Sequence, residues 1–364
     1  IGVLSNQCET NVFVSKTLRR KSPFIDERTD YIMATITEYN IKDQNKWDSL
    51  VRSFSDYDVF YLSSYSKAFM RESPKNGTPI LLYYENGEDR AINVVLRRDV
   101  AKDEKLAGKI KEGMYFDLIT PYGYGGFWGN ITDWEKLNQT YSEYCIENNY
   151  ICEFVRFELF TNYHEYYDGE VETRTHNVVR SLSMPIEEMW MDFKQKVRKN
   201  VKKANSYNLE CIIENTNEHL EDFLRIYYST MDRTDAEGEY YFSIQFYEDL
   251  NEMKDNVMYF HVVYEGKVIS TELVIYGSEN VYSYLGGTDR DFFEVRPNDF
   301  LKFEIIKWAK EKGLKNFVLG GGYGSDDGIY QYKLCLAPHG EYDFYIGRKI
   351  FDRVTYDKLV DLRV

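Results

Sequence analysis

The chain has 364 residues, a formal net charge of −15, and 43% hydrophobic and 29% charged residues. This length allows about two globular domains of about 100–200 residues each. The negative charge argues against nucleic-acid binding over the whole surface, because the average field would repel phosphates, but it does not exclude a local basic site.

Targeting and redox signals in the sequence are few. We find no apolar run near the roughly 18–20 residues of a membrane helix, and no secretory signal. The cysteines are odd in number and lack the spacing of a metal site, so we expect free thiols in a reducing cytosol. They are Cys8, Cys145, Cys152, Cys211 and Cys335.

The first half of the chain predicts an ordered series of elements after an N-terminal extension, residues 1–33. Residues 79–98 form a predicted hairpin that turns at Asn86-Gly87. A strand then runs into the glycine- and tyrosine-rich loop "TPYGYGGFWGN", which contains Tyr122 and Tyr124. An amphipathic helix begins at Trp134, and the segment "YICEFVRFELF" is a further strand.

A basic helix follows in this acidic protein, in the segment "DFKQKVRKNVKKANSYN". Helical spacing places Arg198 and Lys202 on one face and Phe193, Val197 and Val201 on another. The basic face is either a solvated surface, as most charge runs are, or a phosphate-binding patch.

The next segment, "FLRIYYSTMDRTDAEGEYYFSIQFYEDL", predicts two helices around a turn of small and acidic residues. Arg233 and Tyr241 flank that turn. An arginine and aromatic rings on a turn beside a cleft form a plausible ligand grip, and simple surface exposure is the alternative.

The second half repeats the elements of the first. A predicted hairpin turns at Glu265-Gly266, and "VYSYLGGTD" is a strand that ends near Gly286. A helix capped by Asn298 or Asp299 and stopped by Gly313 precedes the strand "KNFVLGGG". The two helices and the two closing strands are each offset by about 165 residues, and such long-period similarity indicates a duplicated unit.

The repeat predicts two copies of one α/β unit with mixed sheets, because each copy combines an antiparallel hairpin with a strand–helix–strand crossover. The expected division is an N-terminal extension, two repeated domains and a helical tail. The ranges are 1–33, 34–180, 187–350 and 351–364.

Several site classes are excluded by the motifs that the sequence lacks. There is no phosphate-loop motif, and "GGGYGS" imitates only part of a dinucleotide fingerprint. The five histidines show no pair at helical ligand spacing, so we expect no metal site. No Gly-x-Ser-x-Gly elbow exists. Chemistry by positioning of two substrates remains, and acyl transfer to an amine fits it.

The ordered set of segments resembles the Fem family, the aminoacyltransferases of peptidoglycan interpeptide bridges. The resemblance covers residues 50–350 and is strongest over 190–335. It rests on the segments "DLITPYGYGGFW", "KVRKNVKKA", "IYYSTMDRT", "YEGKVISTELVIYG", "YSYLGGTD", "NFVLGGG" and "YQYK". Two departures are the absence of a long helical hairpin inserted in the second unit and an N-terminal segment that matches no known pattern.

The resemblance implies a tandem pair of acetyltransferase-like (GNAT) domains, in agreement with the repeat. It also implies transfer of an amino acid from aminoacyl-tRNA to an amine of a cell-wall or polysaccharide precursor in the cytoplasm. No cofactor would be tightly bound and no DNA would be bound. The acceptor would carry phosphate, with a peripheral position at the membrane left open.

The resemblance also suggests site residues. Lys333, in the position of the family's Phe/Tyr-Lys pair, would offset phosphate or oxyanion charge, and Asp327 is the acidic candidate unless it caps a helix that starts near Gly328. The glycines would admit substrate backbone, and the loop and turn residues would line the acceptor groove. The expected binding residues are Tyr122, Tyr124, Arg198, Lys202, Arg233, Tyr241, Gly286, Gly320, Gly321 and Gly322.

Two alternatives stay open at this point. An acyl-CoA-dependent N-acetyltransferase acting on an amino sugar or small amine would need a glycine-rich turn before the crossover helix, where the sequence has "DFFEVRPNDF". A non-catalytic module that binds a nucleotide-sugar or peptide would not need a charge at the position of Lys333.

Overall fold

The computed structural model describes residues 12–14, 34–72, 77–322 and 327–363. The expected N-terminal extension, apart from residues 12–14, and the end of the "GGGYGS" segment therefore lie outside the described residues. The chain divides into two compact units. Unit 1 comprises residues 1–54, 73–172 and 345–364, and unit 2 comprises residues 55–72 and 173–344.

Unit 1 is built on a sheet in the order β1-β2-β3-β4-β5-β7-β14, with β6 paired to β4. All its pairs are antiparallel except β5 with β7, so the sheet is mixed, as expected. The strands are β1 (Val12–Val14), β2 (Thr35–Asn40), β3 (Thr78–Asn86), β4 (Asp89–Asp99), β5 (Phe116–Ile119), β6 (Trp128–Asn130), β7 (Tyr150–Arg156) and β14 (Glu341–Ile350), of which β14 starts in unit 2.

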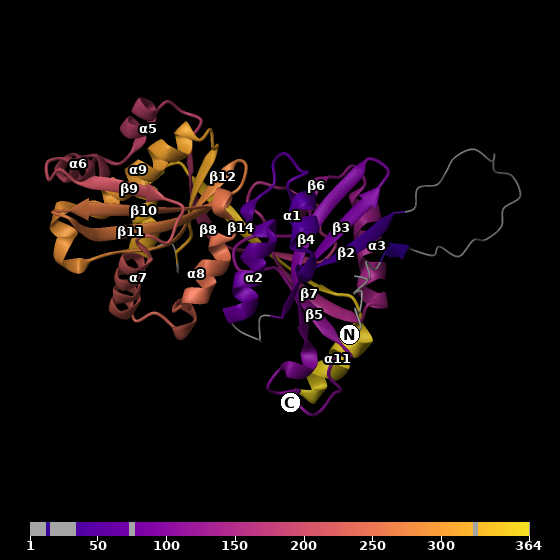
Figure 1. The fold of residues 1–364 in the computed structure, drawn as a ribbon. Coiled ribbons are helices and arrows are strands. Elements are labelled where there is room, and N and C mark those ends of the chain that lie inside the picture. Colours follow the sequence, from indigo (N-terminus) through magenta and orange to yellow (C-terminus); the bar gives the residue numbers. More distant parts are fainter. Residues whose placement is uncertain (1–11, 15–33, 73–76, 323–326, 364) are drawn as a thin grey trace, which may run out of the picture. The chain divides into compact units, whose positions relative to one another are not determined.

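The helices of unit 1 lie against this sheet (Figure 1). The expected amphipathic helix is α3, and it buries Leu137, Tyr141, Tyr144 and Cys145 in the core with strand residues such as Leu82. Residues Arg353–Leu362 form the helix expected in the tail. The helices are α1 (Gln44–Val51), α3 (Trp134–Glu147), α4 (Tyr163–Tyr166) and α11 (Arg353–Leu362).

Unit 2 repeats the plan with a sheet in the order β8-β13-β12-β11-β10-β9. Here the parallel pair is β12 with β13, and the other pairs are antiparallel. The hairpin between β10 and β11 turns at Glu265-Gly266, as the sequence predicted. The strands are β8 (Glu170–Ser181), which starts in unit 1, β9 (Glu210–Glu214), β10 (Val257–Tyr264), β11 (Lys267–Tyr276), β12 (Asn280–Thr288) and β13 (Asn316–Gly320).

Helices cover both faces of the unit 2 sheet (Figure 1). In that view α6 and α9 lie on one face and α7 and α8 on the other. The core on the α6 and α9 side buries Val197 and Val201 against Ile305 and Phe260. The helices are α2 (Ser63–Glu72), α5 (Ile186–Asp192), α6 (Gln195–Asn205), α7 (Leu220–Thr234), α8 (Ile244–Asn251), α9 (Pro297–Glu311) and α10 (Gly328–Leu336).

The segment 55–72 comes from the first half of the sequence but belongs to unit 2, which the expected boundary at residue 180 did not foresee. Asp58, itself buried, accepts hydrogen bonds from Asn280 Nδ2 at 3.0 Å and Tyr282 Oη at 2.6 Å. Lys67 and Arg71 of α2 form ion pairs with Asp249 of α8. These polar contacts hold residues 55–72 on unit 2, and a local sequence pattern does not reveal them because the partners are far apart in the chain.

The start of α9 corrects the expected cap. The N-cap is Arg296, with φ of 60°, and Pro297 is the first helical residue, whereas Asn298 or Asp299 was expected. Proline favours this position because its fixed φ suits the helix and its missing N–H would have no partner there. The expected stop is confirmed, since Gly313 follows the last turn with φ of 79°.

Candidate functional site

The unit 2 sheet opens between its two parallel strands. β12 and β13 pair over only three registers, from Asn280 with Asn316 to Tyr282 with Val318. Beyond them β12 continues along β11 to Thr288, whereas β13 ends at Gly320, which pairs with Val178 of β8 on its other side. Ligands of open α/β sheets bind at the carboxyl ends of strands where neighbours diverge, which makes this end of unit 2 the candidate site.

A buried ion pair lies beside the diverging strands. Lys302 of α9 donates to Glu272 Oε1 of β11 at 2.6 Å and to Ser283 Oγ of β12 at 2.7 Å. The side chains of both charged residues are close to 10% exposed or less. A buried pair of this kind is a weak source of stability, because desolvation offsets the Coulomb attraction. Its position next to the open strands makes it a candidate functional group.

Lys333 of α10 lies within electrostatic range of this pair. Its Nζ donates to the carbonyl oxygen of Gly321 at 2.5 Å. Burial, together with the positive charge of Lys302, lowers the pKa of Lys333 from 10.5 to about 8, and the charges of Glu272 and Asp327 oppose the change. An ammonium held at such a position can stabilise developing negative charge, and its pKa lies where it can also exchange a proton.

Asp299 occupies the first turn of α9. Its Oδ2 accepts from Asn200 Nδ2 of α6 at 3.1 Å, and its buried Oδ1 has no hydrogen-bond partner among the described residues. Burial raises the pKa of Asp299 to about 6, although the hydrogen bond from Asn200 and the charges of Arg296 and Lys196 oppose this. A carboxylate here sits at the positive end of the helix dipole, where an anionic ligand would otherwise bind.

The basic helix α6 presents different residues to the site than the sequence suggested. Arg198 donates to the carbonyl oxygens of Met191 at 2.5 Å and Phe193 at 2.8 Å, so it caps α5. Lys202 is exposed. Lys196 and Asn200, one turn apart, are the α6 residues that interact with Asp299. The proposed roles of Arg198 and Lys202 in ligand binding stay predictions.

Asp327 is the N-cap of α10, which is the alternative to a catalytic acid that the sequence left open. Its carboxylate accepts a hydrogen bond from the backbone N–H of Ile329 at 3.0 Å. Its charge also acts on Lys333. The hydrogen bond gives Asp327 a structural use, and a catalytic role stays a prediction.

The glycines that follow β13 pack against the chain itself. Gly320 has φ of 81°, and a Cβ there would stand 3.4 Å from Lys333 Nζ. A Cβ at Gly321 would come within 2.9 Å of the His176 carbonyl oxygen, and one at Gly322 within 2.6 Å of Asp327 Oδ2. A Cβ at Gly286 would likewise come within 2.6 Å of the Thr271 carbonyl oxygen. These glycines permit the local turn and strand spacing, and contact with substrate stays a prediction.

The four residues expected to line an acceptor groove are divided between the units. Tyr122 is exposed and Tyr124 half-buried in the loop after β5 of unit 1. In unit 2, Arg233 donates to the Thr288 carbonyl oxygen at 3.2 Å, and Tyr241 donates to Asp232 Oδ1 at 2.7 Å. The end of α7 thus holds Arg233 and Tyr241 at the end of β12. A groove shared with Tyr122 and Tyr124 stays a prediction.

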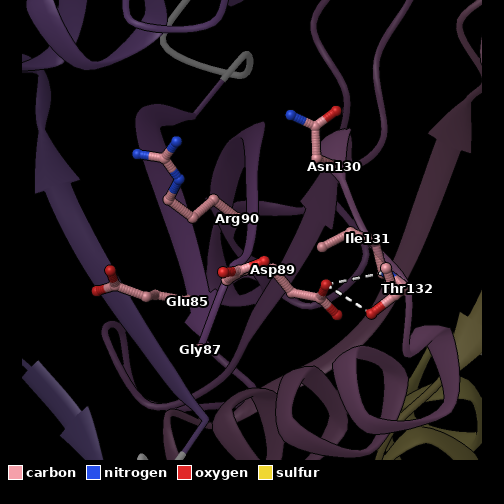
Figure 2. A pocket seen from close by; sticks show the side chains of 9 residues that line it. Glu85, Gly87, Asp89, Arg90, Asn130, Ile131 and Thr132 are labelled. Carbon is pink, nitrogen blue, oxygen red and sulfur yellow. Dashed lines mark hydrogen bonds between the residues drawn. The ribbon is translucent and has the colours of Figure 1, made fainter.

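A surface hollow of about 870 Å³ lies at the β3–β4 turn of unit 1. Figure 2 shows Asp89 turned toward Thr132, whereas Glu85, Arg90 and Asn130 spread around the hollow. Asp89 accepts from Thr132 N at 3.0 Å and Oγ1 at 2.8 Å and from Asp133 N at 3.0 Å. Burial alone would raise the pKa of Asp89, but these hydrogen bonds lower it. Asp89 therefore fixes the start of α3, and we assign the hollow no chemistry.

Sequence reasoning missed the three residues that the structure places at the centre of the site. Glu272 is the single charge in the strand segment "VISTELVIY", and Lys302 and Asp299 interrupt the apolar face of α9 one turn apart. A charge inside an apolar strand or helix face was the available signal, because charged residues are rarely buried unless they are paired. Spacing along the chain does not reveal which of them meet.

Comparison with known proteins finds a family match within unit 2. Residues 191–334, which lie in unit 2, match the acetyltransferase (GNAT) domain family. Over 101 residues the chain is 24% identical to a lipid II:glycine glycyltransferase of Staphylococcus epidermidis, a match that covers 25% of this chain and 24% of the relative. A lipid II:glycine glycyltransferase of Staphylococcus haemolyticus is 22% identical over 104 residues, covering 26% and 25%. The matches thus span about a quarter of these relatives.

Solved structures share the fold over most of the chain. The crystal structure of FemX superposes with a TM-score of 0.67 at 13% identity, covering 88% of this chain and 99% of that one. The structure of L-PGS from Bacillus licheniformis gives a TM-score of 0.53 at 11% identity, covering 88% and 96%. The predicted tandem GNAT-like architecture is confirmed. Unit 2 thus carries the match to the GNAT domain family, a quarter of the chain is similar to lipid II:glycine glycyltransferases, and most of the chain shares the fold of FemX.

Proposed function

We propose that the chain is an N-acyltransferase that moves an aminoacyl group from aminoacyl-tRNA to an amine of a cell-wall precursor. The observation that carries the proposal is Lys333, whose ammonium is held at the end of β13 beside the buried pair of Glu272 and Lys302. Relatives named lipid II:glycine glycyltransferase and the GNAT match support the reaction class. We expect the reaction to take place in the cytoplasm.

In this proposal the acceptor nitrogen attacks the carbonyl carbon of the donor ester. The new C–N bond forms, the ester C–O bond breaks, and the proton lost by the amine ends on the leaving hydroxyl. Negative charge builds on the carbonyl oxygen during attack. Lys333 would stabilise that charge more strongly in the transition state than in the ground state, which is the condition for raising the rate.

Features of α9 favour aminoacyl-tRNA over acyl-CoA as the donor. A CoA pyrophosphate bound at a helix N-terminus uses free backbone N–H groups and the positive helix dipole. Here Pro297 supplies no N–H, and the Asp299 carboxylate already occupies the dipole. With its pKa raised to about 6 by burial, Asp299 is still mostly ionised near neutral pH and would repel a pyrophosphate.

The experiment supplies the purified chain with a panel of charged tRNAs or of acyl-CoA donors, and with lipid-linked or nucleotide-linked cell-wall precursors as acceptors. We expect label to move from one charged tRNA to a precursor amine. Lys333→Met should abolish most transfer. The matched control is Lys307→Met, which removes a surface lysine of α9 that pairs with Glu304 at 2.7 Å.

The other outcomes separate the alternatives. Transfer from acyl-CoA only would contradict the argument from Pro297 and Asp299 and make the chain an acetyltransferase. Tight binding of a precursor without transfer from any donor would instead identify a binding module, and the proposed reaction would be wrong.

A further inference from the structure

A cluster of one carboxylate and two histidines lies at the outer edge of the unit 2 sheet. Glu214 ends the edge strand β9, His219 directly precedes α7, and His261 lies in β10. Glu214 is paired with Tyr259, two residues from His261, so Glu214 and His261 share a face of the sheet. One potential ligand atom from each of the three residues lies within 4.8 Å of the other two.

The ring of His261 has one nitrogen in use and one free. Its Nδ1 lies 2.8 Å from the Thr271 hydroxyl, and its Nε2 lies 3.6 Å from Glu214 Oε1. The side chain is fully buried, and Nε2 has no hydrogen-bond partner among the described residues. When Nδ1–H donates to Thr271, Nε2 carries a lone pair toward the cluster. A buried polar atom without a partner is costly, and metal-binding histidines use their second nitrogen in this way.

The other two residues complete a site that solvent can reach. Glu214 Oε2 lies 2.9 Å from His219 Nδ1, and Glu214 Oε1 accepts from the backbone N–H of His219 at 3.0 Å. The His219 side chain is 25% exposed, so an ion can enter past it. The acidic residues Glu218 and Asp222 stand nearby and add negative potential, although Asp222 is paired with Arg225.

We propose that Glu214, His219 and His261 bind a divalent transition metal, with Zn²⁺ the best match. Two imidazole nitrogens and one carboxylate oxygen form a donor set that zinc accepts, with water as the fourth ligand. Tetrahedral bonds of about 2.1 Å place neighbouring ligand atoms about 3.4 Å apart. The 3.6 Å separation between His261 and Glu214 already fits. His219 Nδ1 lies 2.9 Å from the other oxygen, Glu214 Oε2, so the carboxylate must turn to bring one oxygen to a metal that both imidazoles hold, as the metal replaces the shared proton.

The metal would tie three elements together at the sheet edge. Among the described strands, β9 pairs with β10 alone. An ion between Glu214, His261 and His219 would link this edge strand to β10 and to the start of α7. This function is independent of acyl transfer at Lys333, so either proposal can fail without the other.

The test titrates the chelator-treated 364-residue chain with Zn²⁺ against a chromophoric chelator and uses the visible spectrum of Co²⁺ to report tetrahedral nitrogen and oxygen ligands. We expect one metal per chain. Glu214→Gln and His219→Gln should each weaken binding at least about 100-fold. Thr271→Val, which removes the partner that orients His261, should weaken binding about 10- to 100-fold. These positions avoid truncation of the fully buried His261.

The matched control is His176→Gln. His176 Nδ1 lies 2.9 Å from Asp343 Oδ1, so this pair reproduces one histidine–carboxylate contact outside the cluster. The control should bind Zn²⁺ like the wild type, and Zn²⁺ should raise the melting temperature of both but not that of His219→Gln. No binding by the wild type at micromolar Zn²⁺ would overturn the proposal. Equal binding by folded His219→Gln and wild type would also overturn it, since the metal would then sit elsewhere.

Discussion

Replacement of Lys333 by methionine should make the protein more stable while it removes activity. Burial, together with the charge of Lys302, lowers the pKa of Lys333 from 10.5 to about 8. The folded state therefore disfavours the ammonium relative to the unfolded chain. Each pKa unit is worth about 1.4 kcal/mol, so charging Lys333 costs folding at most about 3 kcal/mol at neutral pH. Methionine removes this cost with a side chain of similar length.

Two effects reduce the gain. The variant loses the hydrogen bond from Nζ to the Gly321 carbonyl oxygen, worth about 1–2 kcal/mol. Lys333 is also only partly buried, so solvent screens part of the cost. We expect Lys333→Met to gain about 1 kcal/mol in free energy of unfolding near pH 7. Transfer activity should fall about 10²- to 10³-fold, the usual effect of losing one oxyanion donor.

The pH dependence fixes the sign of this argument. Because the folded-state pKa lies below the unfolded value, the wild type binds fewer protons when folded and gains stability as pH rises from about 8 to about 10.5. Lys333→Met should lack that rise, so its advantage should disappear near about pH 10. Urea unfolding at both pH values measures this, with Lys307→Met as the control. A variant less stable than the wild type near pH 7, with an unchanged pH profile, would refute the reasoning.

Three further predictions test the surroundings of the site. Glu272→Gln should lower the free energy of unfolding, measured by urea titration, by about 3–5 kcal/mol, because it leaves Lys302 buried without its charged partner. The double variant Glu272→Leu with Lys302→Met should lower it clearly less, and equal losses would contradict a buried ion pair. Burial raises the pKa of Asp299 from 3.8 to about 6, so the contribution of Asp299 to stability is present below about pH 4 and is lost as pH rises through about 6. Asp299→Asn should remove this part of the dependence of unfolding free energy on pH, and an unaltered pH profile would argue against the raised pKa. Arg198→Ala should lower the free energy of unfolding by about 1–2 kcal/mol, because Arg198 hydrogen-bonds the carbonyl groups at the end of α5, whereas Lys202→Ala should change it by less than about 0.5 kcal/mol. Thermal melting measures both, and equal effects would show that the Arg198 cap contributes nothing.

Much of the fold was accessible from the sequence because hairpins, helices and glycine stops are local features. The turn at Glu265-Gly266, the apolar face of α3 and the stop at Gly313 were all predicted and found. The cap of α9 was misplaced because Asn298 and Asp299 are good capping types, and the signal of Pro297 was overlooked. The segment 55–72 could not be assigned to unit 2 because its anchors, Asn280 and Tyr282, lie more than 200 residues away.

The site was less accessible, since its residues meet only in three dimensions. Lys333 was proposed through a family resemblance, but Glu272 and Lys302 are 30 residues apart on a strand and a helix. The same limit applies to the histidine cluster. Sequence spacing argued against a metal site because no two histidines share a helix, yet Glu214, His219 and His261 come together from a strand end, a helix start and a second strand.

The two repeated units differ at the point where the reaction is proposed, and this difference argues for unit 2. In unit 1 the parallel pairing of β5 and β7 continues past the strand end, because Thr120 N donates to the Phe154 carbonyl oxygen at 3.1 Å and Gly125 N to that of Arg156 at 2.7 Å. The buried carboxyl group below it, Glu153, accepts from the hydroxyl groups of Tyr141 and Tyr167. Unit 1 has thus closed the opening with backbone pairing and satisfied its acid internally.

Unit 2 keeps the opening. The pairing of its parallel strands ends at Tyr282 and Val318, and the chain turns at Gly320, which has a positive φ. The carbonyl oxygen of the next residue, Gly321, accepts a hydrogen bond from Lys333 Nζ. Beside it, Asp299 Oδ1 is buried without a hydrogen-bond partner among the described residues, and partial burial together with the charge of Lys302 lowers the pKa of Lys333 to about 8. Groups that are buried, charged and incompletely satisfied cost stability and persist where function uses them. The Glu153 carboxylate of unit 1 is therefore hydrogen-bonded within the protein, whereas we expect the groups beside the opening of unit 2 to act on substrate.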